Sequence, residues 1–150
     1  MRIPEDYLPA EPSHEEVLAA FEGWHPDFLS VLSRSDGPLV RRFIHSLPIG
    51  LTWPRVPGVT LLGDAAHVMP PFAGAGVNLA MEDAADLARA LIGHPQNTEA
   101  ALAAYESRLF PRSQEVAQQS TDGLEQAFAP DAPRPYYDFF AAMASARKDE

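Results

Sequence analysis

The hydrophobic pattern changes twice between residues 59 and 91, and these changes predict a strand, a turn, a loop and a helix in that order. Residues 59–62 form a short apolar run that is typical of a buried strand, and the run stops at the turn pair Gly63-Asp64. A segment with two prolines and two glycines follows. From Val77 onward the apolar positions recur at helical spacing, so we expect a helix over residues 77–91.

The predicted helix over residues 77–91 has an apolar face and an acidic face. Gly93 and Pro95 mark its end, since neither residue continues a helix readily. The face that we expect to be buried is formed by Val77, Met81, Ala84, Ala88 and Leu91. The acids Glu82, Asp83 and Asp86 are interpreted as a solvated face, with the acids near the helix start favoured by the helix dipole.

Two short helices and two short strands are predicted before this stretch. Ser13 and Glu16 form a capping-box pattern, which begins a helix that ends near Gly23. A second helix begins at His25-Pro26. Its apolar positions are Phe28, Leu29 and Leu32. Imperfect alternation predicts a strand over residues 39–47, and a second short strand is expected at residues 51–53.

A long helical pattern follows the predicted helix over residues 77–91. Asn97 or Thr98 caps its start. Pro111 removes one backbone hydrogen bond, so we expect it to kink or break the helix. The pattern continues towards Phe128, and residues 136–143 predict a short aromatic helix.

Composition restricts the class of protein. The chain has 150 residues, which is enough for a hydrophobic core, and 46% of them are hydrophobic. The net charge of −10 argues against nucleic-acid binding, because there is no basic patch to neutralise phosphates. The absence of cysteine excludes disulfides and thiolate metal sites. No apolar run approaches the length of a membrane helix and no signal peptide is recognisable, so a cytoplasmic location is expected.

The order of strand, acidic turn, loop and helix suits the binding of a flat ligand that carries a sugar. At the end of a strand, the Asp64 carboxylate can accept hydrogen bonds from a ribose diol. Gly74 and Gly76 allow a close approach of the backbone because glycine has no Cβ. The unpaired N–H groups at the start of the helix face the same loop. Leu79 stands where GxGxxG requires its third glycine, so this is not a dinucleotide fingerprint.

Other kinds of site have little support in the sequence. The five histidines are scattered without metal-ligand spacing, and no Gly-x-Ser-x-Gly elbow of a serine hydrolase is present. His67 is interpreted as a structural hydrogen-bonding residue that follows the turn. We assign neither a catalytic side chain nor a metal ligand.

The full motif is more specific than its glycines. It reads Gly63-Asp64-Ala65-Ala66-His67, then Pro70-Pro71, Gly74-x-Gly76-x-Asn78 and Asp83-Ala84. This string resembles the second flavin-binding motif of FAD-dependent aromatic-ring hydroxylases, the flavoprotein monooxygenases of the para-hydroxybenzoate hydroxylase type. The version from Met69 to Gly74 looks most like that of tetracycline-inactivating monooxygenases.

The resemblance implies a role for each matching residue. FAD would be bound by Gly63, Asp64, Pro71, Gly74, Gly76, Val77 and Asn78, with Asp64 at the ribose and the backbone of residues 76–78 at the isoalloxazine. Phe72 and Ala73 would face the substrate. The implied reaction is the hydroxylation of an aromatic or polyketide-like substrate by a flavin C4a-hydroperoxide, with oxygen as co-substrate and NAD(P)H as reductant. The protein would supply position and electrostatics to the cofactor.

The chain also departs from the family, which opens with a βαβ unit and GxGxxG. We therefore expect an α/β or α+β fragment, mostly helical, from the C-terminal part of such an enzyme. Residues 1–57 would end the substrate-binding domain, and residues 58–150 would form the C-terminal part of the FAD-binding domain with C-terminal helices. The fragment is expected to need the missing N-terminal half for activity. The alternative is a non-catalytic interaction fragment or a subunit of a split flavoprotein, with a partner chain or self-association.

Overall fold

The computed structural model describes residues 9–134, 136–138 and 140–141. They form two compact units, one that ends at Ile44 and one that begins at His45. The functional boundary between residues 57 and 58 that the sequence suggests stays a prediction. The two units are considered in turn.

The first unit contains both of the short helices that the sequence predicts, α1 (His14–Ala20) and α2 (Pro26–Ser33). At the start of α1 the Glu16 amide donates to Ser13 Oγ at 3.2 Å, and the Ser13 amide donates to the Glu16 carboxylate at 2.8 Å. This reciprocal pair is a complete capping box, which satisfies donors that a helix start otherwise leaves free. Pro26 occupies the first turn of α2, where a missing N–H costs nothing.

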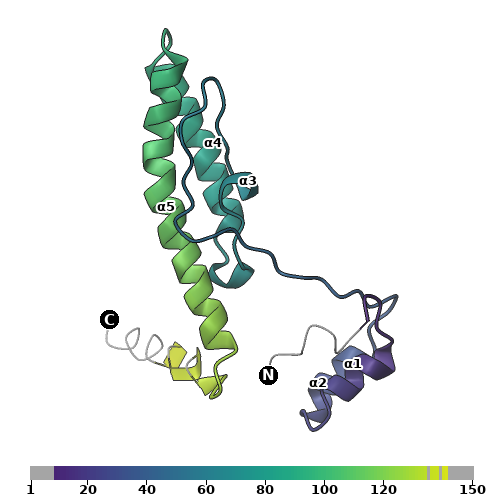
Figure 1. The fold of residues 1–150 in the computed structure, drawn as a ribbon. Helices are drawn as coiled ribbons and strands as arrows, with labels where there is room; N and C mark the ends of the chain where they lie inside the picture. Colours follow the sequence, from purple (N-terminus) through teal and green to yellow (C-terminus); the bar gives the residue numbers. More distant parts are fainter. Residues whose placement is uncertain (1–8, 135, 139, 142–150) are drawn as a thin grey trace. The chain divides into compact units, whose positions relative to one another are not determined.

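The second unit is a helical hairpin with two short helices beside it. It contains α3 (Asp64–His67), the 3-10 turn η1 (Pro71–Ala73), α4 (Gly76–Gly93) and α5 (Thr98–Ala127). Figure 1 shows α4 and α5 side by side, running in opposite directions. The tight connection between them includes Asn97, whose side chain accepts from the Ala100 amide at 3.0 Å and caps α5.

A small apolar core holds this hairpin together. It consists of Ala66, Ala90, Ala101, Tyr105 and Leu109, with Trp53, Leu87 and Phe110 packed against it. The ring of Trp53 meets that of Phe110 edge to face at a centroid distance of 4.8 Å. Tyr105 is fully buried, and its hydroxyl donates to the Leu61 carbonyl at 3.0 Å. Burial, together with the nearby charge of Asp83, raises the pKa of the Tyr105 phenol.

The expected break at Pro111 is wrong, because α5 continues through this residue as one helix, whereas the expected kink stays a prediction. Pro111 removes a single hydrogen bond from the helix. Leu109 before it and Ser113 and Ala117 after it are all buried. Packing on both sides of the proline therefore holds the helix in one piece.

The three predicted strands are not found. Within the described residues the only β feature is an isolated antiparallel bridge between Val56 and Val59. Residues 39–47, 51–53 and 59–62 carry no ladder, because a strand is stable only when a neighbouring strand accepts and donates its backbone hydrogen bonds. The described chain is therefore mostly helical, as expected, but it lacks the strand component of an α/β or α+β fold.

The C-terminal prediction lies only partly within the described residues. Arg134, residues 136–138 and residues 140–141 are helical, whereas the rest of the aromatic helix predicted over residues 136–143 lies outside the described part. Among the helices that the structure describes, none combines the length and the apolar character needed to cross a membrane.

Side-chain hydrogen bonds attach the irregular segment before α3 to α5. Glu106 of α5 is buried, and its Oε1 accepts from Trp53 Nε1 at 3.1 Å, from Arg55 Nη1 at 2.7 Å and from Thr60 Oγ1 at 2.8 Å. About two turns earlier on α5, Glu99 accepts from Arg55 Nη2 at 2.8 Å and from the Gly58 amide at 2.6 Å. Two carboxylates of α5 thus hold this segment in place, a role that backbone hydrogen bonds between strands have in a sheet.

Replacing Glu106 with alanine tests this attachment. We expect Glu106→Ala to lower the free energy of unfolding by about 2–4 kcal/mol, because three donors lose one buried acceptor. Chemical denaturation followed by circular dichroism measures the change. Glu115→Ala, on the exposed side of the same helix, is the matched control and should stay within about 0.5 kcal/mol of the wild type. Equal effects of the two variants would contradict the assignment.

Candidate functional site

The predicted site residues all lie in the second unit, between the start of α3 and the first turn of α4. Gly63 precedes α3 with φ 59° and ψ −144°, a conformation that side-chain-bearing residues rarely adopt. It also lies against α4, since a Cβ at this position would be 3.3 Å from the Cβ of Ala80. The structure therefore brings the Gly63-Asp64 turn next to the beginning of α4 and requires glycine there.

Asp64 is the first residue of α3 and is exposed. Its carboxylate has no hydrogen-bond or ion-pair partner among the described residues, in contrast to the other acids near the turn. Such a carboxylate is available to accept hydrogen bonds from a ligand.

The loop between α3 and α4 is built around η1. Pro71 and Ala73 in this turn are exposed, and Phe72 between them is half-buried. Gly74 ends the turn in the left-handed conformation with φ 63°, which favours glycine. The Gly74 amide donates back to the Pro71 carbonyl at 3.1 Å and closes the turn.

The N-terminus of α4 presents free backbone donors. The Leu79 amide is the first in the helix that finds a backbone acceptor, the carbonyl of Ala75. The amides of Gly76, Val77 and Asn78 precede it and have no acceptor among the described residues. The first turn contains no acidic residue and no side-chain cap. The helix dipole there makes the position favourable for an electron-rich group.

Open space adjoins two of the loop glycines. A Cβ built on Gly74 or on Gly76 would meet no atom within 4 Å. These glycines therefore do not fill a crowded position inside the chain, and a ligand can approach the backbone at both of them.

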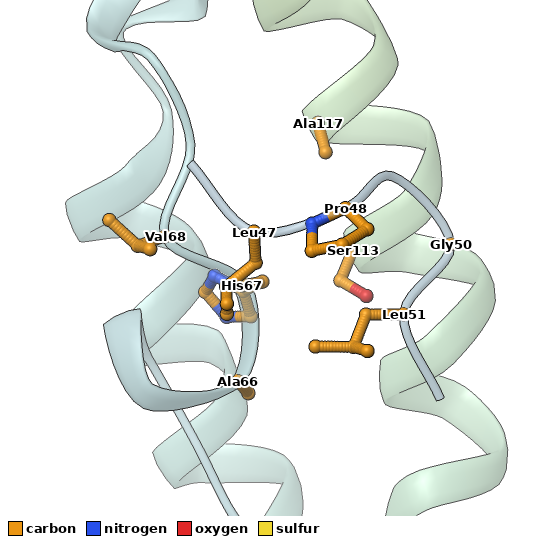
Figure 2. A pocket seen from close by; sticks show the side chains of 9 residues that line it. All are labelled: Leu47, Pro48, Gly50, Leu51, Ala66, His67, Val68, Ser113 and Ala117. Carbon is orange, nitrogen blue, oxygen red and sulfur yellow. The ribbon is translucent and has the colours of Figure 1, made fainter. Parts of the chain in front are cut away.

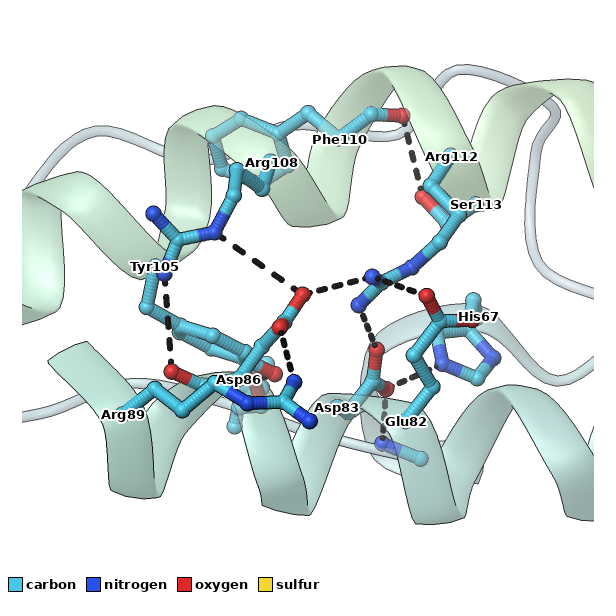
Figure 3. Close-up of polar contacts among 12 residues, drawn as sticks. His67, Glu82, Asp83, Asp86, Arg89, Tyr105, Arg108, Phe110, Arg112 and Ser113 are labelled. Carbon is cyan, nitrogen blue, oxygen red and sulfur yellow. Dashed lines mark hydrogen bonds and ion pairs between the residues drawn. The ribbon is translucent and has the colours of Figure 1, made fainter.

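The interpretation of Asp83 and Asp86 as part of a solvated face is wrong. Asp83 is fully buried, and its Oδ2 accepts from the Gly63 amide at 2.9 Å and from His67 Nε2 at 2.5 Å. Its Oδ1 accepts from Arg112 Nη2 at 2.9 Å. Figure 3 shows this carboxylate at the meeting point of α3, α4 and α5. A charge can be buried here because hydrogen bonds and an ion pair compensate for its lost hydration.

Arg112 extends the network along α4. Its Nη1 lies 2.6 Å from Asp86 Oδ2 and 2.9 Å from Glu82 Oε1 (Figure 3). Asp86 also accepts from Arg89 at 2.9 Å. The hydrogen bond from Arg112 is the main cause that holds the pKa of the Asp86 carboxyl below its usual range. Of the three acids, only Glu82 has a largely exposed side chain.

The apolar face expected to be buried on α4 is exposed instead. Val77 is 76% exposed and Met81 68%, and the other residues of that face, Ala84, Ala88 and Leu91, are exposed as well. The face that packs against α5 carries Leu79, Asp83, Asp86 and Ala90. Their spacing of four, three and four residues is a helical core spacing with two acids in it. That spacing is the sequence signal that identifies them.

His67 is confirmed as a structural hydrogen-bonding residue, since it is buried and paired with Asp83. It also lines a cavity of about 10 Å³ between residues 47–51, α3 and α5 (Figure 2). Its Nδ1 is buried without a hydrogen-bond partner among the described residues. The cavity is about the size of a single water molecule, so it is too small for any organic ligand.

The buried charge of Asp83 can be tested against that of its exposed neighbour. We expect Asp83→Asn to lower the free energy of unfolding by about 3–5 kcal/mol, because Arg112 and His67 lose the charge that they share. Glu82→Gln removes the largely exposed partner of the same arginine and should cost about 0–1 kcal/mol. Urea denaturation of both variants gives the comparison, and a small loss in Asp83→Asn would contradict the network.

The lowered pKa of Asp86 predicts a dependence of stability on pH. Because the folded state holds this carboxyl ionised, its contribution is present above the ordinary aspartate pKa of about 3.9 and is lost as the pH falls through the folded value. Melting temperatures between pH 5 and pH 2 should therefore fall less steeply in Asp86→Asn than in the wild type. The exposed Asp122→Asn is the control. Parallel curves for wild type and Asp86→Asn would rule out the contribution.

Part of the second unit matches a known family of protein domains. Residues 54–120 match the FAD binding domain family. The chain is 35% identical to 3-amino-4-hydroxybenzoate 2-monooxygenase PtnB3 of Streptomyces platensis, over 84% of this chain and 31% of that protein. It is 37% identical to 6-hydroxynicotinate 3-monooxygenase of Pseudomonas fluorescens, over 75% of this chain and 29% of that protein.

A third relative, kynurenine 3-monooxygenase of Salinispora arenicola, is 44% identical over 49% of this chain and 16% of its own length. The chain thus spans less than a third of the length of each of these three relatives. The matched segment includes the buried acids of α4, the free amides at its start and the Gly63-Asp64 turn. Residues 54–120 belong to the FAD binding domain family, and the chain is similar to a part of each of these monooxygenases.

Proposed function

We propose that this chain provides the side of an FAD site that holds the ribose and the isoalloxazine ring, in a monooxygenase that acts on an aromatic substrate. The observation that carries the proposal is the pairing of two free groups within the segment matched to the FAD binding domain. One is the exposed Asp64 carboxylate, and the other is the set of free amides at Gly76, Val77 and Asn78. They lie on two helices that Asp83 and Gly63 connect directly.

The residues present fit this cofactor chemically. The Asp64 carboxylate accepts hydrogen bonds, which suits a ribose diol. The amides at the start of α4 donate hydrogen bonds, and the helix dipole favours negative charge on the pyrimidine side of a reduced flavin. The open space beside Gly74 and Gly76 allows a planar ring to approach the backbone. Pro71 stands at the edge of the same loop and would border the ring.

The chemistry itself belongs to the cofactor. FAD, once bound and reduced by NAD(P)H, would supply the activation of dioxygen, in which one oxygen atom enters the substrate and the other leaves as water. This chain's residues would bind the flavin, stabilise its charge and orient the substrate. Phe72 and Ala73 would face the substrate. The ring of Phe128 packs against the ring of Phe72 at a centroid distance of 5.9 Å. The names of the relatives describe substrates with benzoate, nicotinate and kynurenine skeletons, and we propose an aromatic or polyketide-like compound here.

The exposed apolar surfaces support a further part of the proposal. Val77 and Met81 on α4, together with Leu61 and Leu62 before α3, are each at least 40% exposed. We propose that residues outside this sequence, in the same polypeptide or in a partner chain, provide a sheet against these surfaces. Residues 59–62 would then form the strand that the sequence predicts. The same residues would carry the binding site for the ADP half of FAD.

The exposed face also favours a second candidate function, an interaction segment or a subunit of a split flavoprotein. An unpartnered apolar face on a helix drives association with another protein surface. Light scattering of the isolated chain shows whether it associates or stays monomeric. A concentration-dependent mass would support an interaction role, whereas a monomer with a cooperative melt would contradict it.

Asp64→Ala tests the assignment to FAD. We expect the affinity for FAD to fall between about fivefold and 150-fold, because charge-assisted hydrogen bonds to the ribose are worth about 1–3 kcal/mol. Titration with FAD, followed by flavin fluorescence, measures the affinity. Asp122→Asn, an exposed acid on α5, is the control and should bind as the wild type does. Equal affinities for wild type and Asp64→Ala would refute the role of this carboxylate.

A further inference from the structure

We propose that α5 positions the substrate-facing turn Pro71–Ala73 through two of its own residues, Ser120 and Gly123. This inference rests on the proposed function, which places Phe72 and Ala73 at the substrate. Neither Ser120 nor Gly123 belongs to the flavin-binding motif, and both lie more than 40 residues after the turn. The structure nevertheless places them against it, and η1 has more extensive contact with α5 than with α4.

Ser120 joins the two ends of the turn. Its side chain is fully buried, and its hydroxyl donates to the carbonyl of Pro70. The same oxygen accepts from the amide of Ala73 at 3.3 Å. One hydroxyl therefore satisfies a backbone acceptor before the turn and a backbone donor at its end. Pro70 and Pro71 provide no N–H, and the turn is only three residues long. Few other backbone groups can therefore fix the position of the turn.

Gly123 provides the surface on which Phe72 rests. A Cβ at position 123 would be 3.1 Å from the Cβ of Phe72 and 3.4 Å from its carbonyl oxygen. A distance of 3.1 Å is shorter than ordinary van der Waals contact, so the close approach of α5 to Phe72 depends on glycine at this position. Gly123 lies inside α5, where alanine would otherwise be the better helix former.

Two aromatic residues complete the support. Phe128, just after α5, meets the ring of Phe72 nearly edge to face, with an interplanar angle of 77°. The hydroxyl of Tyr136 donates to the carbonyl of Gly123 at 2.8 Å. The position of Phe72 is thus set by the last two turns of α5 and the residues that follow them.

The helix α5 has a double role. Through Arg112 it fixes Asp83, which holds the Gly63 amide on the cofactor side. Through Ser120 it fixes the turn on the substrate side. These two residues are eight positions apart, about 12 Å along the helix. One continuous helix therefore sets the spacing between the two sides of the proposed site, and Ser120 and Gly123 are positioning residues that need not touch the substrate.

The test compares buried serines on the same helix in the full 150-residue chain. Ser113 is also buried, but its hydroxyl donates to the Phe110 carbonyl of its own helix. Hydrogen exchange of the Ala73 amide and the NMR signals of the Phe72 ring, assigned with Phe72→Leu, provide the readouts. Ser120→Ala should speed exchange at Ala73 by about twofold to tenfold and shift the Phe72 signals. Ser113→Ala should change neither, although it too loses a buried hydroxyl.

A second pair of variants keeps the test decisive if Ser120→Ala does not fold. Gly123→Ala adds a methyl group against Phe72, and we expect the Phe72 signals to shift. Gly93→Ala, at a helical glycine with open space around it, is the control and should leave those signals in place. Unchanged Phe72 signals in folded Gly123→Ala, or shifts of the same size in Gly93→Ala, would overturn the proposal.

These measurements need no ligand, so they are independent of the proposed function. Adding FAD to the wild-type chain in the same spectra separates the two claims. If FAD leaves the amides of residues 76–78 unchanged, the proposed function fails, whereas the positioning of Phe72 by α5 is still decided by the ligand-free spectra. If FAD shifts those amides while Phe72 is insensitive to Ser120 and Gly123, only the positioning fails.

Discussion

The buried carboxylate of Asp83 is the interaction on which the second unit depends. It is fully buried and takes hydrogen bonds from the Gly63 amide, from His67 and from Arg112. These donors come from the turn before α3, from α3 and from α5, so one side chain of α4 connects all of them. Because an unpaired buried charge is very costly, each donor has to stay in place. The positions of Asp64 and of the free amides of α4 follow from this constraint.

The helix α4 consequently has two packing faces of opposite character. The face towards α5 carries Asp83 and Asp86, compensated largely by Arg112, beside the buried apolar residues Leu79 and Ala90. The outer face is apolar and exposed, with Val77 and Met81 at the end nearest the proposed site. Ion pairs give direction and register to a helix pair, whereas an apolar face packs against any complementary surface. This division explains how the hairpin forms without a sheet beside it.

The sequence predicts α1, α2, α4 and α5 well, because their signals are local, whereas it predicts a turn and a loop where α3 and η1 form. The caps at Ser13 and Asn97 and the stop at Gly93 each act within a few residues. Residues 59–62 show the limit of such signals, since a strand needs a partner that the hydrophobic run itself does not specify. At Pro111 the packing on both sides outweighs the loss of one hydrogen bond, so α5 continues through this residue.

The candidate site is predictable from the motif as a list of residues, but its support is not. Asp83 and Asp86 look like surface acids because Arg112, which compensates them, comes 26 to 29 residues later. Ser120 and Gly123 belong to no recognisable sequence motif, and only the tertiary structure places them next to the turn that contains Phe72. Motifs therefore identify groups that would meet a ligand, whereas the groups that hold them in position depend on long-range contacts.

The most direct measurement of the central claim is the NMR mapping of backbone amides while FAD is added to the 150-residue chain. This method detects weak binding, which suits a chain that would hold only one side of the cofactor. The account predicts that the largest shifts occur at Gly63, Asp64 and the amides of residues 76–78, with smaller changes along the rest of α4 and α5. Shifts centred elsewhere, or no shifts at millimolar FAD in a chain shown to be folded, would contradict it.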